Sequence, residues 1–184
     1  MSGLDWSTAT TLAELGELTA RYLSGEAGES PTYLGPPDPE TAEILEPLLA
    51  LNRAGFVTDQ SQPAGSGDGW QQCAFVEGFC TEDLAKRIAD ACLTADLWVR
   101  YVPPHVRPRW RTVYLYSTPV TTERGVAHTR IGAIPSTREL RWLWGGELSR
   151  AGLDTLLGAH QVIAYDPQWG RRDRLWQTLT EAVR

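Results

Sequence analysis

Cysteine, lysine and histidine are all scarce in this sequence, and each shortage removes a class of function. The only cysteines are Cys73, Cys80 and Cys92, an odd number without a CxxC spacing, so neither a disulfide framework nor a zinc ribbon is predicted. No His, Cys and carboxylate spacing fits a metal centre, and no GxSxG turn is present to hold a nucleophilic serine. We therefore expect no metal, no cofactor and no covalent mechanism.

Positive charge and long apolar runs are also lacking. The formal net charge of −6 argues against a general nucleic-acid binder, because such a protein needs surplus Lys and Arg to displace counterions. Lys86 is the only lysine, and no phosphate-binding GxxxxGK loop is present. No run approaches the about 20 apolar residues that span a bilayer, and the N-terminus has no signal-peptide pattern. We expect a soluble, cytoplasmic protein.

Tryptophan and amphipathic patterning are abundant. Eight tryptophans in 184 residues, with 42% hydrophobic residues, are enough for the core of one globular domain. Apolar periodicity predicts helices over 11–24, 39–54, 82–94, 137–144, 153–157 and 174–183, and strands over 56–58, 71–78, 97–102, 111–117, 126–133 and 161–165. The 137–144 segment also permits a strand. Asp38, Thr81, Ser136 and Asp173 are expected to cap helices, and Pro47 to kink or break one.

Together these elements predict a single α+β domain over residues 1–184. We expect a mixed sheet of five or six strands with helices mainly on one face. The run GEAGESPTYLGPP, residues 25–37, has too many glycines and prolines for regular structure, so an irregular surface connection is expected there. The oligomeric state and the strand order stay open.

The polar stretch from Thr58 to Gln72 is the first candidate site. Its hydroxyl and amide groups predict hydrogen bonds to a ligand, and its three glycines would let backbone amides approach that ligand. The candidate ligand-binding residues here are Thr58, Ser61, Gln62 and Gln71. The alternative interpretation is a solvated connection between two strands, from about Asp59 to Gly69.

A second candidate group combines a histidine, an arginine and a glutamate. Alternate strand residues point the same way, so His128 and Arg130 share one face of their strand. With Glu77 from another strand nearby, His128 would move a proton and Arg130 would hold an anion. We therefore take His128 and Glu77 as candidate catalytic residues. The alternative is a histidine that is merely structural or exposed.

Two further groups of residues could bind a ligand, and each of them also has a purely structural interpretation. Asp166 and Trp169 directly follow the last predicted strand, where α/β proteins often place ligands, but an Asp-Pro turn leading into the final helix is the favoured interpretation. The basic and aromatic cluster consists of Arg100, Arg107, Arg109 and Arg111 with Tyr101, Trp110 and Tyr114. It could stack a base and hold a phosphate, or its arginines could pair with acidic neighbours, as the net charge favours.

Two longer motifs carry a resemblance to a known family. Residues 52–63 read NRAGFVTxxSQP and residues 161–171 read QVxxxDPxWGR. On these motifs, and over nearly the whole length from Leu12 to the closing helix, the chain resembles a family of actinobacterial hypothetical proteins of unknown function. The resemblance implies a compact domain from an actinobacterial cytoplasm and makes the two motif segments candidate walls of a site. It implies no activity, cofactor or catalytic residue.

The function that we expect is binding or conversion of a small polar molecule. The pocket would lie between the 58–72 stretch and the strand of His128 and Arg130, and nucleotide-like or phosphorylated molecules are among the candidates. An alternative of another class is a non-enzymatic interaction module whose exposed Trp and Tyr residues bind a protein partner. A nucleic-acid-associated factor using the arginine cluster is the third alternative.

Overall fold

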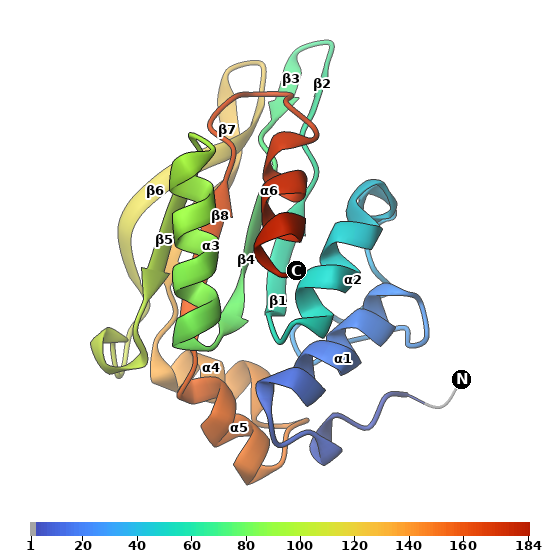
Figure 1. Cartoon of the computed structure of the whole chain (residues 1–184), viewed down its shortest axis with the longest axis vertical. Helices are drawn as coiled ribbons and strands as arrows, with labels where there is room; N and C mark the ends of the chain where they lie inside the picture. The colour runs from blue at the N-terminus through green and yellow to red at the C-terminus, as the bar shows by residue number, and fades with distance from the viewer. Residues whose placement is uncertain (1–2) are drawn as a thin grey trace.

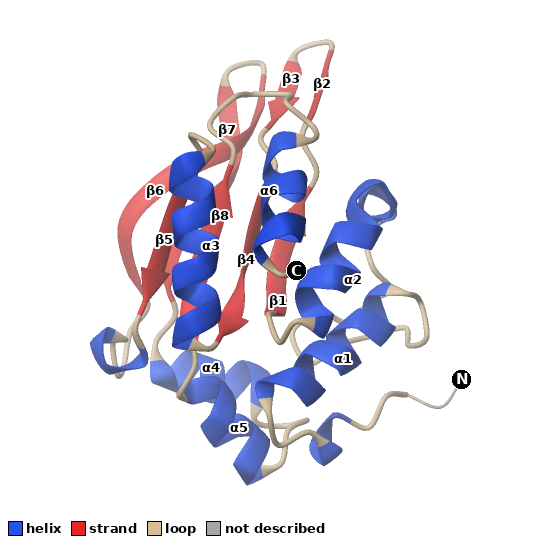
Figure 2. Cartoon of the chain, viewed as in Figure 1, coloured by secondary structure: helices blue, strands red, loops and turns tan. Residues whose placement is uncertain are grey.

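The protein combines helices with two antiparallel β-sheets (Figure 1, Figure 2). The structure, a computed structural model, describes residues 3–184, with backbone only for residues 115–117. The first four-stranded sheet has the order β1 (Val57–Gln62), β4 (Phe75–Cys80), β8 (His160–Tyr165) and β5 (Trp98–Val102). The second has the order β2 (Gly65–Gly67), β3 (Trp70–Gln72), β6 (Val113–Glu123) and β7 (Val126–Ile134). The predicted α+β class is confirmed, but two antiparallel sheets replace the single mixed sheet that we expected.

The stretch from Thr58 to Gln72 is mainly strand, and it joins the two sheets. It leaves the first sheet after β1, forms the β2–β3 hairpin of the second sheet and returns as β4. The side chain of Trp70 lies over the hairpin, where a Cβ atom at Gly65 or Gly67 would come within 2.6 or 2.2 Å of its ring. The predicted loop from Asp59 to Gly69 is therefore wrong, because the glycines provide room for an indole in a hairpin.

The helices begin largely where the sequence predicts. They are α1 (Leu12–Leu23), α2 (Leu45–Arg53), α3 (Glu82–Thr94), α4 (Thr137–Trp144), α5 (Arg150–Leu157) and α6 (Arg174–Ala182), with short 3-10 turns η1 (Trp6–Thr8), η2 (Pro39–Ile44) and η3 (Pro104–Val106). The side chains of Asp38, Thr81 and Ser136 cap their helices, whereas Asp173 holds the cap position without a side-chain bond. Pro47 lies in the first turn of α2, where a backbone N–H has no intrahelical acceptor, so this proline does not interrupt the helix. The predicted break lies earlier, where η2 ends at Ile44 and α2 begins at Leu45.

Helices cover both faces of the first sheet. α2, α3 and α6 pack on one face, over Val76, Cys80 and Val162 (Figure 1). On the other face, one end packs against α1, α4 and α5 around Val57 and Phe79, and the remainder packs against the second sheet. The expectation of helices mainly on one face therefore describes α2, α3 and α6 only. Within the described residues, no helix has both the length and the apolar character needed to cross a membrane.

Candidate functional site

The cavity that brings predicted site residues together runs along β1, which is one of the two edge strands of the first sheet. Its volume is about 460 Å³, within the roughly 300–1,000 Å³ typical of small-molecule sites. The walls are β1, residues 30–41, the end of α1 and the end of α4. The 25–37 connection is irregular as predicted, with a single bridge between Ser30 and Tyr33, but it also forms part of this wall.

The cavity lining is polar and acidic. Hydroxyl groups come from Thr19, Tyr22, Ser30, Thr32, Tyr33, Thr41, Thr58, Ser61 and Thr129. Amides come from Gln60 and Gln62, and carboxyl groups from Asp38, Glu40 and Asp59. Among the described residues that line the cavity, none is Lys, Arg or His. An anionic ligand would therefore meet carboxylates without a basic partner.

Asp59 is the acidic group on the strand itself. A β-bulge between Thr58 and Gln60 interrupts the register of β1 against β4 at this residue. Asp59 is partly buried, and burial is the main reason that its pKa rises to about 6. The charge of Glu139 raises the pKa further, and a hydrogen bond with the Thr32 side chain opposes the rise.

Glu77 is a second carboxyl group, on the neighbouring strand β4 and opposite Gln60. Its side chain accepts a hydrogen bond from Nε2 of Gln161, and the residue is 7% exposed. Burial, and then the charge of Asp59, raise the pKa of Glu77 to about 8, while Gln161 and Arg100 lower it. Near neutral pH the pair therefore holds one ionised carboxylate, Asp59, with protonated Glu77 beside it.

Two polar side chains connect this carboxyl pair to the second sheet. Nη2 of Arg100 donates to the carbonyl oxygen of Gly132 at 3.0 Å, and Nε2 of Gln161 donates to that of Ala133 at 2.9 Å. Both carbonyls belong to β7, so these bonds hold β7 against the first sheet. The arginine cluster predicted from the sequence is therefore divided, because the Arg100 side chain bonds to β7 inside the protein.

Three of the predicted ligand-binding residues line the cavity: Thr58, Ser61 and Gln62. Gln62 already uses its amide, donating to the carbonyls of Cys73 and Val120 and accepting from Thr121, which joins the two sheets. The Thr58 hydroxyl accepts from the side chain of Asn52 at 2.8 Å.

The predicted catalytic histidine lies elsewhere. His128 and Arg130 are exposed on β7, and Thr129 between them is the residue of this strand that faces the cavity. Nε2 of His128 lies 3.5 Å from the Glu123 carboxylate. Alternation along the strand correctly grouped His128 with Arg130 but left open which face meets the first sheet. Gln71, on β3, is also exposed and outside the cavity lining.

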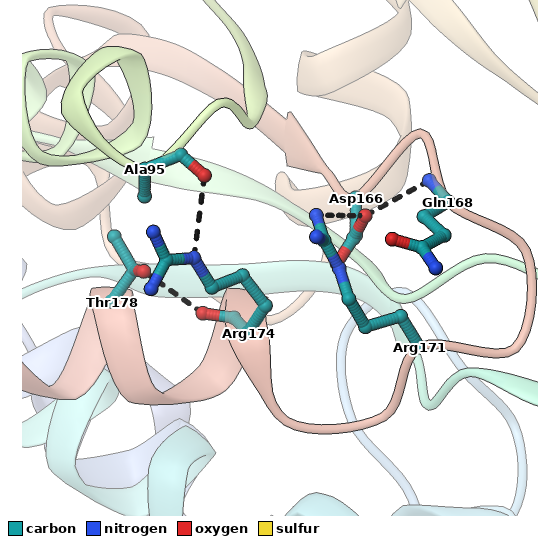
Figure 3. Close-up of polar contacts among 6 residues, drawn as sticks. All are labelled: Ala95, Asp166, Gln168, Arg171, Arg174 and Thr178. Carbon is teal, nitrogen blue, oxygen red and sulfur yellow. Dashed lines mark hydrogen bonds and ion pairs between the residues drawn. The ribbon is translucent and has the colours of Figure 1, made fainter.

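Asp166 and Trp169 have structural roles in the loop before α6, and Figure 3 shows Asp166 with its polar partners. Asp166 is fully buried, and its carboxylate accepts two bonds from the Arg171 guanidinium, at 2.5 and 2.7 Å, and one from the Gln168 backbone N–H. Trp169 packs against the apolar cluster between the sheets. The same loop also bonds to the β2–β3 segment, since the backbone N–H of Gly170 donates to Gln72. These contacts favour the turn interpretation of the motif.

The remaining predicted groups do not form a reactive or basic centre. Arg107 is buried and donates to the carbonyls of Leu157 and Ala159, which leaves Arg109 and Arg111 on the surface. The three cysteines are free and buried, and burial raises the pKa of each thiol. No group of acidic, His or Cys side chains suited to a metal ion occurs among the described residues.

A larger cavity of about 580 Å³ lies between η2, the start of α2 and α6. Acidic and basic side chains both line it, and Arg172 and Glu43 in its wall lie 3.6 Å apart. Pro63 belongs to the nominated 58–72 stretch, but no candidate ligand-binding or catalytic residue lines this cavity. The smaller cavity along β1 is therefore the stronger candidate, because Asp59 and three of the nominated residues meet there.

Asp59 was not among the predicted site residues, although it lies inside the first motif. An acidic residue in a polar stretch is usually solvated, so only the fold identifies it as a cavity group.

Among curated proteins, none matches the chain. One family does match, over residues 3–184, and it is described as a domain of unknown function, DUF6919. The expected membership of a family of unknown function is thus confirmed: the chain belongs to the DUF6919 family.

Proposed function

We propose that this protein binds a small polar molecule that lacks phosphate and carboxylate groups in the cavity along β1. The observation that carries this proposal is the lining, in which hydroxyl, amide and carboxyl groups surround about 460 Å³ without a basic side chain among the described lining residues. Hydroxyls and amides pair well with neutral polar groups, whereas an anion would be left uncompensated. The phosphorylated and nucleotide-like candidates are disfavoured for this reason.

The carboxyl pair supplies an acid–base group if the bound molecule is converted. Two neighbouring carboxyl groups whose pKa values are about 6 and about 8 divide into a base and an acid near neutral pH. Asp59 borders the cavity and takes the role of proton acceptor that the sequence assigned to His128. Glu77, on the neighbouring strand, stays protonated beside it because burial and the charge of Asp59 raise its pKa.

Blocking the cavity tests the binding proposal. A panel of neutral polyols, sugars and amines, screened by thermal shift, should contain a compound that stabilises the protein, by about 2.7 kcal/mol at 100 times its Kd. Ser61→Phe places a ring in the cavity and should weaken that binding at least about 10-fold, because Ser61 lines the wall. Gln71→Phe, on an exposed site of β3, is the control. Equal binding by both variants would place the ligand outside the cavity.

A second candidate function is protein interaction through exposed aromatic residues. Trp110, Tyr114 and Trp142 are 63%, 71% and 79% exposed, and such residues are enriched at binding hot spots. Backbone bonds from Thr137 and Arg138 to residues 108 and 109 place Trp110 next to the start of α4, the helix of Trp142. If this surface mediates self-association, the mass from light scattering should rise with concentration, and Trp110→Ser with Trp142→Ser should abolish the rise. A constant mass would count against self-association.

We propose a cytoplasmic setting for this activity. Three free cysteines, all buried and none paired, are compatible with a reducing compartment.

A further inference from the structure

We infer that the ligand of the β1 cavity carries a protonated amine that sits on the Asp59 carboxylate, with a hydroxyl or carbonyl oxygen beside it that accepts from the Trp144 indole N–H. This inference rests on the proposed function and names the chemical class of its ligand. Amino sugars and amino alcohols have the required pair of groups.

The charge of the cavity favours a cation. Asp59 borders it directly, and Asp38 and Glu40 add two further acidic side chains to the wall. Glu40 accepts a hydrogen bond from Gln72, and Asp38 caps η2, so both keep their carboxyl groups near the wall. A protonated amine would therefore be attracted by several carboxylates, in a partly enclosed site where charges are screened less than in water.

Among the described residues, no basic side chain compensates the charge of Asp59. The groups that act on its carboxyl are the Thr32 hydroxyl and the charge of Glu139, and its charge in turn raises the pKa of Glu77. Arg100 compensates Glu77 and lies on β5, on the far side of β4 and β8 from Asp59. A partly buried carboxylate facing other carboxyls is costly, and a ligand cation would relieve that cost.

Trp144 provides an independent sign of a ligand. This residue is 2% exposed and lines the cavity, and its indole N–H has no acceptor in the part of the chain that the structure describes. Its ring meets that of Trp6 edge-on, with centroids 6.5 Å apart, so its orientation is held by packing. A buried donor without an acceptor is unfavourable, and an oxygen atom on the ligand would satisfy it.

These two features exclude related classes of ligand. An amino acid brings a carboxylate, and a sugar phosphate brings a phosphate, for which the lining provides no basic partner. A purely apolar amine leaves the indole N–H without an acceptor. An amine with a nearby oxygen satisfies both Asp59 and Trp144.

Matched pairs of compounds test the inference, each pair differing in one kind of group. The pairs are glucosamine with glucose, 2-aminoethanol with ethylene glycol, and 1,4-diaminobutane with 1,4-butanediol, measured by calorimetry at pH 7.5. We expect at least one amine, glucosamine or 2-aminoethanol, to bind at least about 10-fold more tightly than its alcohol. Asp59→Asn should bring that ratio close to one, whereas Asp68→Asn, an exposed aspartate between β2 and β3, should leave it unchanged.

The pH dependence gives a second readout. The affinity for the amine should rise between pH 5 and 7, because the Asp59 carboxyl, with a pKa of about 6, ionises over this range while the amine stays protonated. Trp144→Phe, which keeps an aromatic ring, should weaken the binding of glucosamine and the binding of glucose by a similar factor, since both compounds have oxygen acceptors.

The outcomes separate the inference from the proposed function. Alcohols that bind as tightly as their amines, and lose binding with Ser61→Phe, would overturn the cationic ligand and leave the cavity proposal standing. An amine preference that survives Asp59→Asn would also overturn the inference. If none of the six compounds binds, the inference fails. The proposed function fails with it only if the wider panel of neutral polyols and sugars is also silent.

Discussion

Replacing Arg171 with alanine is expected to lower the free energy of unfolding by about 2–4 kcal/mol. Its guanidinium donates two hydrogen bonds to Asp166, whose side chain is fully buried. Without Arg171 the carboxylate keeps its bond from the Gln168 backbone but loses its cation. Arg171 is itself one-third exposed, so water entering from that side would relieve part of the penalty. Urea unfolding at neutral pH measures the change.

The neighbouring arginine is the matched control. Arg172 is 64% exposed, and its nearest ion pair, with Glu43, spans 3.6 Å, so Arg172→Ala should change the free energy of unfolding by less than about 0.5 kcal/mol. Arg171→Lys should give an intermediate loss, because a lysine cannot reproduce the bidentate geometry. Ligand affinity below the unfolding temperature should be unchanged in all three variants. A selective loss of affinity with Arg171→Ala would instead restore Asp166 to the list of ligand-binding residues.

The helices could be predicted because their signals are local. A capping side chain at Thr81 or Ser136 bonds to a backbone N–H three residues further along, so the evidence is contained in a few neighbouring positions. α1 shows the limit of this reading. Its cap is Thr11, in a reciprocal capping box with Glu14, although Thr8 and Thr10 carry the same hydroxyl group nearby. Thr8, Thr10 and Thr11 lie within four positions, and the local sequence does not determine which of their hydroxyl groups caps the helix.

The division into two sheets could not be predicted, because it depends on pairing between distant residues. β3 pairs with β6, so that Gln71 lies opposite Thr122, about fifty positions away in the chain. The strand β1 reads Val-Thr-Asp-Gln-Ser-Gln, which has few apolar residues because β1 is an edge strand. A polar edge strand and a glycine-rich hairpin both resemble a solvated loop when only their composition is considered.

The candidate site was predictable only in part, because it too depends on contacts between residues that are distant in the sequence. Ser61 and Thr58 were nominated as polar groups near a turn, and the cavity does include them. Glu77 was nominated as a candidate catalytic residue together with His128, but the fold places it next to Asp59 and Gln161 instead. Glu77 lies on β4, between β1 and β8, and its hydrogen-bond partner Gln161 is distant in the sequence, so no short window of sequence reveals the burial that raises its pKa.

Glu77→Gln is expected to stabilise the protein above neutral pH, by a few kcal/mol at pH 9. Burial and the charge of Asp59 raise the pKa of Glu77 from 4.5 to about 8 in the folded state. A folded-state pKa above the unfolded value means that the contribution to stability is complete below about pH 4.5 and is lost as pH rises to about 8. Each unit of difference corresponds to about 1.4 kcal/mol. An amide does not ionise, so the variant avoids this loss.

The substitution should fit the existing contacts. Gln161 can still donate to the side-chain oxygen at position 77, and the amide carries no charge for Asp59 to repel. The expected result is a flatter stability curve between pH 5 and 9, with a residual slope between about pH 4 and 6 from Asp59, whose pKa rises from 3.8 to about 6. Chemical unfolding of the wild-type protein and of Glu77→Gln at several pH values measures the two stability curves. Glu147→Gln, at an exposed position between α4 and α5, should leave the slope of the curve unchanged.

The opposite outcome has a definite physical meaning. Arg100 lowers the pKa of Glu77, and a dominant attraction between the two would make Glu77 an ionised partner of that arginine. In that case Glu77→Gln would destabilise the protein at pH 9, because it would remove a carboxylate that attracts the partly buried Arg100 guanidinium. Stabilisation at pH 9 instead implies that the fold tolerates an unfavourable buried acid beside the cavity. A residue that lowers stability in this way is typical of a binding or catalytic site, where function and not stability determines the residue.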